Sequence, residues 1–322
     1  MTASTLLPVT RAADLAEVAT ERRWLVEYLW ADEAVGIVGG EPKCCKSFLA
    51  LALAVAVASG EPCMRRFPVV RTGRVLLFAA EDALHVVRQR LAGIARAAGR
   101  ELADLDIQVI TAPSVRLDVD RDRDALTETV AKLRPRLLVL DPFVRLHRID
   151  ENISGEVAPL LAYLRELQRR YHVAVVLVHH ARKGGAKMRA GQALRGSSEF
   201  HAWGDSNLYL RRHGEQLTLS VEHRAAASIS NVALHLDTAD GAVALAALED
   251  DERAPGPVAS SPAALTVEHR ILAQFDGAAA PLTATALRKL CQIRNATMKT
   301  ALAALVADGH LRRDRVGYVL AR

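Results

Sequence analysis

The stretch GGEPKCCKS, from Gly39 to Ser47, constrains this chain more than any other part of its 322 residues. It follows an apolar run, Ala34 to Val38, and opens a longer one that continues to Ser59. This order predicts a strand, a tight loop and a helix. In such a loop, backbone N–H groups and the helix N-terminus surround the phosphates of a nucleotide while a lysine neutralises them. The stretch therefore predicts an ATP site at the start of an α/β domain.

One position of this loop departs from the usual pattern. Gly40, Lys46 and Ser47 fill three of the four fixed positions of G-x-x-x-x-G-K-[ST], and the fourth, normally glycine, is Cys45. A side chain there would crowd the phosphates or demand an unfavourable backbone angle. A thiol beside Lys46 also gives the hypothesis that oxidation of Cys44 or Cys45 switches ATP binding off. The predicted ATP-binding residues are Gly40, Pro42, Lys43, Cys44, Cys45, Lys46, Ser47 and Phe48.

Further apolar runs predict buried strands that alternate with helices. They are Arg74–Ala80, Arg136–Asp141 and Val173–His180, with a shorter strand near Ile107–Thr111. The alternation predicts an α/β fold with a mostly parallel central sheet. Ligands of such sheets bind at the carboxyl ends of the strands. The residues at those ends are Glu81, Asp141, His179 and His180.

The helices between these strands follow from apolar stripes and end signals. They are expected at Lys46–Ser59, from Asp82 as a cap to Ala98, at Asp122–Leu133 and at Gly155–Arg170. Three shorter strands are expected to close the sheet in antiparallel fashion, at Asn207–Arg211, Gln216–His223 and Val232–Leu236.

The C-terminal part reads as a separate small domain. Helices are expected near Leu265–Phe275, Ala284–Cys291 and Asn295–Asp308, followed by a strand pair within Leu311–Leu320. This order is typical of a winged helix-turn-helix. The expected organisation is a leader over residues 1–33, an ATPase domain over 34–248, a linker over 249–263 and a winged-helix DNA-binding domain over 264–322.

The positive charge of the chain is concentrated in this tail. From Ala264 onward there are nine Lys and Arg against four Asp and Glu, which accounts for the whole net charge of +5. A basic tail on a neutral body indicates an anionic partner, most often nucleic acid, although a solvated basic face or a protein-docking module remains the alternative. The predicted DNA contacts of the tail are Arg294, Asn295, Thr297 and Lys299 on the third helix and Arg312, Arg313 and Arg315 on the wing.

Several classes of protein are not indicated by the composition. The four cysteines form no C-x-x-C pair and have no histidine at zinc-site spacing, so reduced thiols are expected rather than a disulfide or metal framework. No signal pattern or membrane-length apolar run is present in the sequence. A soluble, cytoplasmic protein is therefore expected.

Taken in order, GGEPKCCKS, VLLFAAED, LLVLDPFVRLHRIDEN and VVLVHHARK with LRGSS resemble the RepA-type branch of the RecA-like P-loop ATPases, a group of hexameric helicases and mobile-element ATPases. The resemblance extends from about Arg22 to Leu245 and does not include the winged helix. It implies a RecA-like core, ATP and Mg²⁺ as cofactors, and a homo-oligomer, with a hexamer favoured. It also implies DNA as partner, single-stranded in the ring pore, on a plasmid or mobile element. Duplex DNA is expected at the winged helix because of the residues of the tail itself.

The resemblance also implies roles for individual residues. Lys46 would contact the phosphates, and Ser47 and Asp141 would hold Mg²⁺, although Asp141 has the alternative of a strand-end cap. Glu81 would be the catalytic carboxylate, and His179 or His180 a sensor of the γ-phosphate unless it is a core histidine. His147, Asp150 and Glu151 would line the site or hold a loop.

Hydrolysis in this group is completed by an arginine of the neighbouring subunit. Arg224 is the predicted finger, although Glu222 departs from the basic residue expected two positions earlier, and Arg211 or Arg212 is the second choice. A basic loop would grip the backbone of nucleic acid, unless it is a solvated surface loop. Its residues are Arg182, Lys183, Lys187, Arg189 and Arg195.

These features predict an ATP-hydrolysing, ring-forming DNA motor. Two alternatives stay open. One is an ATP-dependent DNA-binding regulator or assembly factor that unwinds nothing. The other is a nucleotide-binding scaffold with an inactive site.

Overall fold

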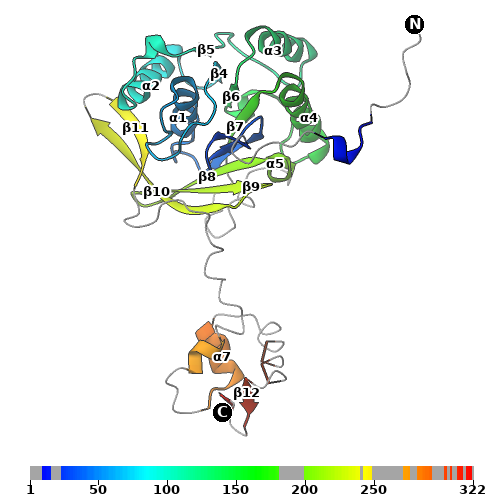
Figure 1. Cartoon of the computed structure of the whole chain (residues 1–322), viewed down its shortest axis with the longest axis vertical. Coiled ribbons are helices and arrows are strands. Elements are labelled where there is room, and N and C mark those ends of the chain that lie inside the picture. Colours follow the sequence, from blue (N-terminus) through cyan, green and yellow to red (C-terminus); the bar gives the residue numbers. More distant parts are fainter. Residues whose placement is uncertain are drawn as a thin grey trace. The chain divides into compact units, whose positions relative to one another are not determined.

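The computed structural model describes residues 9–15, 23–180, 199–239, 242–248, 271–275, 281–291, 301–302, 305–306, 310–314 and 317–320. The chain divides into two compact units, Met1–Asp251 and Glu252–Arg322. The described strands of the larger unit include a nine-stranded sheet with the order β11-β10-β9-β8-β3-β7-β6-β4-β5 (Figure 1).

The central strands of this sheet are parallel, as the sequence predicts. Their side chains are almost all buried, because helices cover both faces of the sheet (Figure 1). β3 lies between β7 and β8, and β6 and β4 continue the sheet toward β5. The bounds are β3 Val35–Gly40, β7 Ala174–His180, β6 Leu137–Asp141, β4 Val75–Ala79 and β5 Ile107–Val109.

The other half of the sheet corrects one prediction. β8 (Ser206–His213) pairs parallel with β3, not antiparallel as expected for this segment. The N–H of Asp205 donates to the carbonyl of Val35, so the chain enters β8 at the same end as β3. β9 (Gln216–His223), β10 (Ile229–Ala239) and β11 (Ala242–Ala247) then follow in antiparallel pairs. β11, an alanine-rich strand, was not predicted.

Helices cover the two faces of the sheet in two sets (Figure 1). α1 (Lys46–Ser59) and α2 (Leu84–Ala97) pack on one face, hereafter the α1 face. α3 (Asp120–Leu133), α4 (Ser154–Tyr171) and α5 (Glu199–Trp203) pack on the other, the α4 face. α1 is apolar almost all round, as a helix buried against both sheet and α2 must be, and it ends at Gly60, where φ is 82°.

Short elements complete the larger unit. β1 (Trp24–Val26) pairs with β2 (Trp30–Ala31), and Leu25 in β1 and Leu29 in the turn between the strands are fully buried. Short 3₁₀ turns lie at η1 (Ala12–Asp14), η3 (Leu102–Asp104) and η4 (Phe143–Arg145).

The smaller unit has its own apolar cluster, which includes Ile271, Leu287 and Leu311. Its elements are η7 (Ala273–Phe275), α7 (Ala284–Cys291) and an antiparallel pair of β12 (Leu311–Arg313) and β13 (Tyr318–Leu320). α7 and the hairpin lie where the sequence places a helix and a wing. The predicted helices at Leu265–Phe275 and Asn295–Asp308 fall largely outside the described residues, so the winged helix stays a prediction.

Across the residues that the structure describes, no helix has the length and apolar character needed to cross a bilayer.

Candidate nucleotide site

The loop from Glu41 to Cys45 joins β3 to α1 and has the backbone of a phosphate cradle. A Cβ added at Gly40 would lie 2.5 Å from the carbonyl oxygen of Leu210 and 2.6 Å from Sγ of Cys44, so only glycine fits there. Cys45 has φ 64° and ψ 27°, a left-handed conformation that favours glycine. A non-glycine residue held there costs about 1–2 kcal/mol. The departure at position 45 is thus a residue held in a strained backbone conformation.

Lys46 lies inside this loop and is only 6% exposed. Its Nζ donates to the carbonyl of Glu41 at 2.8 Å and lies 4.0 Å from Sγ of Cys44. Burial lowers the pKa of Lys46 and raises that of the Cys44 thiol. Among the described residues, no side chain caps the first turn of α1. The free N–H groups of that turn and the buried ammonium fit an anionic phosphate.

Ser47 and Asp141 meet at the start of α1 and the end of β6. The Ser47 side chain lies close enough to the Asp141 carboxylate, which is 8% exposed, to influence its pKa. Burial raises the pKa of Asp141 to about 6, and the nearby Asp82 and Glu81 carboxylates add to the rise. A hydroxyl and a carboxylate side by side are hard oxygen ligands, which suit Mg²⁺. The described part of the chain has no cluster of three or more His, Cys, Asp or Glu that could hold a metal, and a Mg²⁺ shared with phosphates needs none.

Glu81 follows the end of β4 and is paired with a cation that the sequence did not indicate. Nε of Arg145, on η4, donates to Oε1 of Glu81 at 3.0 Å, and both side chains are largely exposed. Glu81 is close enough to affect the pKa values of Lys46 and Asp141 electrostatically. The carboxylate therefore lies at the phosphate loop.

Asp82, the next residue, was predicted to cap α2, and this prediction is wrong. The N-cap residue is Ala83, and its side chain makes no capping bond. Asp82 instead forms an ion pair with Arg90, whose guanidinium lies 5.2 Å from the ring centroid of Phe48. The carboxylate is turned toward α2's own arginine rather than toward the amides of its first turn.

The pleat of β7 separates the two histidines. Along this strand Val176 and Val178 pack on the α1 face, whereas Val175 and Leu177 pack on the α4 face. His179 follows the α4 face: it is buried and stacks on Phe200 with 4.3 Å between ring centroids. His180, opposite Gly40 in the β3–β7 register, falls on the α1 face with the phosphate loop. The geometry thus separates a histidine buried on the α4 face from one that lies on the α1 face.

Two further polar residues, Asp141 and Glu81, end or follow strands whose alternate side chains also pack on the α1 face. Val139 of β6 and Leu77 of β4 pack on the α1 face, and Asp141 and Glu81 lie two and four residues beyond them. His147, by contrast, packs against Phe143 with centroids 4.2 Å apart, and its Nε2 is 3.3 Å from Oε1 of Glu151. Asp150 accepts bonds from the backbone and side chain of Asn152. His147, Asp150 and Glu151 therefore hold the segment after η4.

Arg224 lies at the opposite edge of the sheet from the phosphate loop. Ser206, the first residue of β8, pairs with His223, while Leu210 pairs with Gly40. Ser206 and Leu210 are four residues apart along β8, so at about 3.3 Å per strand residue the two edges are about 13 Å apart. Arg224 donates to the carbonyl of Ala202 and lies 3.5 Å from Oδ1 of Asp205. It cannot reach the phosphate loop of its own chain.

The two second-choice arginines lie on opposite faces of β8. Arg211 continues the parity of Tyr209 on the α4 face, where it lines a polar pocket of 740 Å³ together with Glu222 and Arg224. Arg212 continues the parity of Leu210 on the α1 face, and its Nη2 is 3.4 Å from Sγ of Cys45. The structure thus brings Arg212 to its own phosphate loop.

Most of the predicted nucleic-acid contacts fall outside the described residues. Arg312 and Arg313 are described, and both are exposed on β12, opposite Val319 and Tyr318. The residues that lie outside the description are Arg182, Lys183, Lys187, Arg189, Arg195, Arg294, Asn295, Thr297, Lys299 and Arg315.

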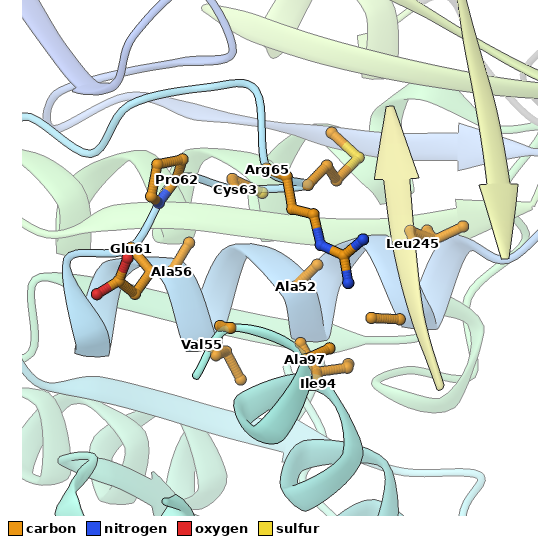
Figure 2. Close-up of a pocket in the computed structure, with 13 residues that line it drawn as sticks. Ala52, Val55, Ala56, Glu61, Pro62, Cys63, Arg65, Ile94, Ala97 and Leu245 are labelled. Carbon is orange, nitrogen blue, oxygen red and sulfur yellow. The ribbon is translucent and has the colours of Figure 1, made fainter. Parts of the chain in front are cut away.

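A second cavity, of 240 Å³, lies between α1, α2 and β11 (Figure 2). Figure 2 shows Ala52, Val55 and Ala56 on α1 facing Ile94 and Ala97 on α2, with Leu245 on β11. Cys63 also lines it, and burial raises the pKa of this thiol to about 12. None of the phosphate-loop residues lines this cavity, whose lining also includes Glu61 and Arg65, so it is separate from the nucleotide site.

Known proteins resemble this chain in sequence and in fold. The AAA_25 family model, described as an AAA domain, matches residues 2–186. The solved structure of a DnaB-like replicative helicase, described with its interactions with primase, has a TM-score of 0.50 at 14% identity, over 67% of this chain and 58% of that one. The RadB recombinase has a TM-score of 0.48 at 16% identity, over 66% of this chain and 91% of that one. This chain thus spans somewhat more than half of the helicase chain, and at this identity the likeness is one of fold.

Proposed function

The chain belongs to the AAA domain family and has a RecA-like P-loop ATPase core, and from that premise we propose that it is an ATP-hydrolysing, ring-forming motor that acts on DNA. The observation that carries the proposal is that Lys46, Ser47 and Glu81 all lie close enough to Asp141 to affect its pKa. These side chains come from three separate elements. Each is of the type that phosphoryl transfer to water requires.

The roles follow from the contacts. Lys46 is already buried in the loop, so phosphate oxygens would replace the carbonyl of Glu41 as its acceptors. Ser47 and Asp141 would hold Mg²⁺, which when bound neutralises the charge that develops on the phosphates. Glu81 is exposed enough to meet a water molecule and would orient it and accept its proton. His180 would contact the γ-phosphate from the adjacent strand.

The same proposal includes an oligomer, with a hexameric ring favoured. Arg224 lies at the edge of the sheet remote from its own phosphate loop, and the polar pocket beside it is also lined by Arg211. An arginine placed there would serve hydrolysis only in a neighbouring subunit. A nucleotide bound at the interface between subunits would then receive Lys46 from one chain and Arg224 from the next.

DNA is the proposed partner because of charge. The whole net charge of +5 lies in the tail from Ala264, and Arg312 and Arg313 are exposed on the hairpin of the smaller unit. Single-stranded DNA in the pore and the DNA of a plasmid or mobile element follow from the resemblance, whereas duplex DNA at a winged helix follows from the predicted fold of the tail.

The test is ATP turnover with and without DNA on purified full-length chain. Lys46→Ala is expected to abolish nucleotide binding and turnover. Glu81→Gln is expected to keep binding and lower turnover by a factor of about 10²–10⁴, because only the acceptor of the water proton is lost. Undiminished turnover in either variant would refute the proposed ATPase site.

One observation favours the alternative of an ATP-dependent DNA-binding regulator without unwinding activity. Cys45 has a strained, left-handed backbone and places a side chain in the loop where glycine is usual. Such a loop suits slow ATP hydrolysis. A strand-displacement assay on the same preparation separates the two functions. ATP hydrolysis without displacement would favour the regulator, and displacement that needs Lys46 would favour the motor.

A further inference from the structure

Arg212 lies beside the phosphate loop because β8 runs parallel to β3. Leu210 of β8 is opposite Gly40, the last residue of β3, so the carboxyl end of β8 passes the same edge of the sheet as the loop. The side chains of Leu208 and Leu210 pack on the α1 face. Arg212 is two residues further and continues that face.

The Arg212 side chain contacts the residue that replaces the usual glycine. Its Nη2 donates to Sγ of Cys45 at 3.4 Å, and its positive charge also acts on the neighbouring Cys44 thiol. Within the described residues, Arg212 makes no ion pair with a carboxylate, although it is exposed. A thiol is a weak acceptor, so this contact orients the guanidinium and leaves most of its N–H donors available.

We propose that Arg212 binds the phosphates of the nucleotide held by its own chain, and that Cys45 positions it for this. The proposal rests on the proposed ATP site. A glycine at position 45 would offer the guanidinium no anchor, whereas the thiol holds it at the N-terminal end of α1. A planar guanidinium can donate two parallel hydrogen bonds to phosphate, a geometry that the ammonium of Lys46 lacks.

This role differs from that of an arginine finger. A finger reaches the nucleotide of the neighbouring subunit, as proposed for Arg224, whereas Arg212 touches its own loop. Cys45 then has a role of its own, and its strained backbone is retained because the thiol brings a second cationic side chain, beside Lys46, to the site.

The experiment measures the affinity of the full-length chain for a fluorescent ATP analogue with Mg²⁺. Arg212→Ala is expected to weaken binding about 10-fold, and Arg212→Lys to restore part of the loss because the charge returns without the fork. Arg169→Ala is the matched control: it removes one exposed positive charge from α4, on the other face of the sheet, and is expected to bind as the unmodified chain does. An Arg212→Ala chain that binds the analogue as tightly as the unmodified chain would overturn the proposal. If Arg212→Ala fails to fold, Arg212→Lys is used instead, and its unchanged affinity would overturn the proposed two-bond contact with phosphate.

The part played by Cys45 is tested by a double-mutant cycle. In a Cys45→Gly background, Arg212→Ala is expected to weaken binding at least threefold less than in the unmodified chain, because the anchor is already gone. Equal losses in both backgrounds would overturn the positioning role.

Mixing chains separates action on the same subunit from action on its neighbour. Lys46→Ala chains keep Arg212 but lack the phosphate lysine, so adding them to Arg212→Ala chains is expected not to restore affinity. Restoration would overturn the proposal in favour of a finger. If the unmodified chain binds no nucleotide, or Lys46→Ala binds as well as it does, the proposed ATP site itself fails. If Lys46→Ala loses binding and Arg212→Ala does not, only the present inference fails.

Discussion

Arg145 donates to the carboxylate of Glu81 across 3.0 Å and joins two strand ends, because Glu81 follows β4 and Arg145 lies on the turn after β6. Phe143, on the same turn, anchors it: its side chain is fully buried and packs against the rings of His147 and Phe200. The Arg145 guanidinium therefore binds the proposed catalytic carboxylate from a turn that the buried Phe143 anchors.

Arg145→Ala is expected to lower ATP turnover by a factor of about 2 to 5 and to leave ATP affinity unchanged, since the pair orients Glu81 and does not touch the loop. The effect is small because exposed ion pairs contribute only about 0–1 kcal/mol. Steady-state kinetics beside equilibrium binding separates the two quantities. Arg145→Lys should recover part of the turnover, and a variant whose affinity falls while turnover per bound nucleotide holds would contradict the assignment.

The two strand-end histidines should differ in what they affect. His180→Ala is expected to reduce ATP turnover with little loss of stability, because His180 is half-buried on the α1 face beside the loop. His179→Ala is expected to lower stability by about 1–3 kcal/mol, because the buried ring that stacks on Phe200 is lost. Denaturant unfolding and ATPase rates on both variants would check this, and the opposite pattern would contradict the pleat argument.

Gly36 and Gly155 form a matched pair for stability. A Cβ at Gly36 would lie 1.6 Å from the carbonyl oxygen of Ser206, so Gly36→Ala must push β8 away from β3 and is expected to cost about 3 kcal/mol or more. A Cβ at Gly155, in α4, meets nothing within 4 Å among the described residues. Gly155→Ala is expected to stabilise by about 0.5–1 kcal/mol. Urea midpoints measure both, and similar midpoints for the two variants would count against the close β3–β8 approach.

His223 predicts a pH dependence of stability. Nε2 donates to the carbonyl of Tyr28 at 3.1 Å, Nδ1 accepts from the Ser206 hydroxyl at 3.0 Å, and the ring packs edge-on against Trp24. These bonds require the neutral ring, and burial lowers the pKa of His223 below 6.5. As the pH falls through 6.5, the unfolded chain takes up a proton that the folded chain refuses. The contribution of His223 to the free energy of unfolding therefore falls as the pH drops below 6.5, by up to about 1.4 kcal/mol per pH unit.

His223→Gln is the variant that tests this linkage. It is expected to lose about 1 kcal/mol at pH 7.5 through weaker hydrogen bonds, and to show a smaller drop in unfolding free energy between pH 7.5 and pH 5 than the unmodified chain. Guanidinium unfolding at several pH values gives both numbers. Parallel curves for the two proteins would show that His223 does not contribute to the acid loss.

Much of the larger unit follows from local sequence. Continuous apolar runs placed β3, β4, β6 and β7 within one or two residues, because a strand covered on both faces needs apolar side chains at every position. α1 was predicted with its observed bounds, since its start is the loop lysine and its end is a glycine. The direction of β8 was not predictable from its own residues, because pairing direction depends on where the chain enters the sheet.

The sequence by itself predicted a phosphate loop at Gly39–Ser47 and determined that Asp141, Glu81 and the histidine pair follow or end strands at the same edge of a sheet. Motif spacing and the rule that parallel strands end together suffice for that. Only the tertiary structure decided that His180 rather than His179 shares the face of α1, that Arg145 holds Glu81, and that Arg212 rather than Arg224 touches its own loop. The reason is physical: each depends on strand register and pleat parity across segments far apart in the chain, and a shift of one residue would exchange the faces.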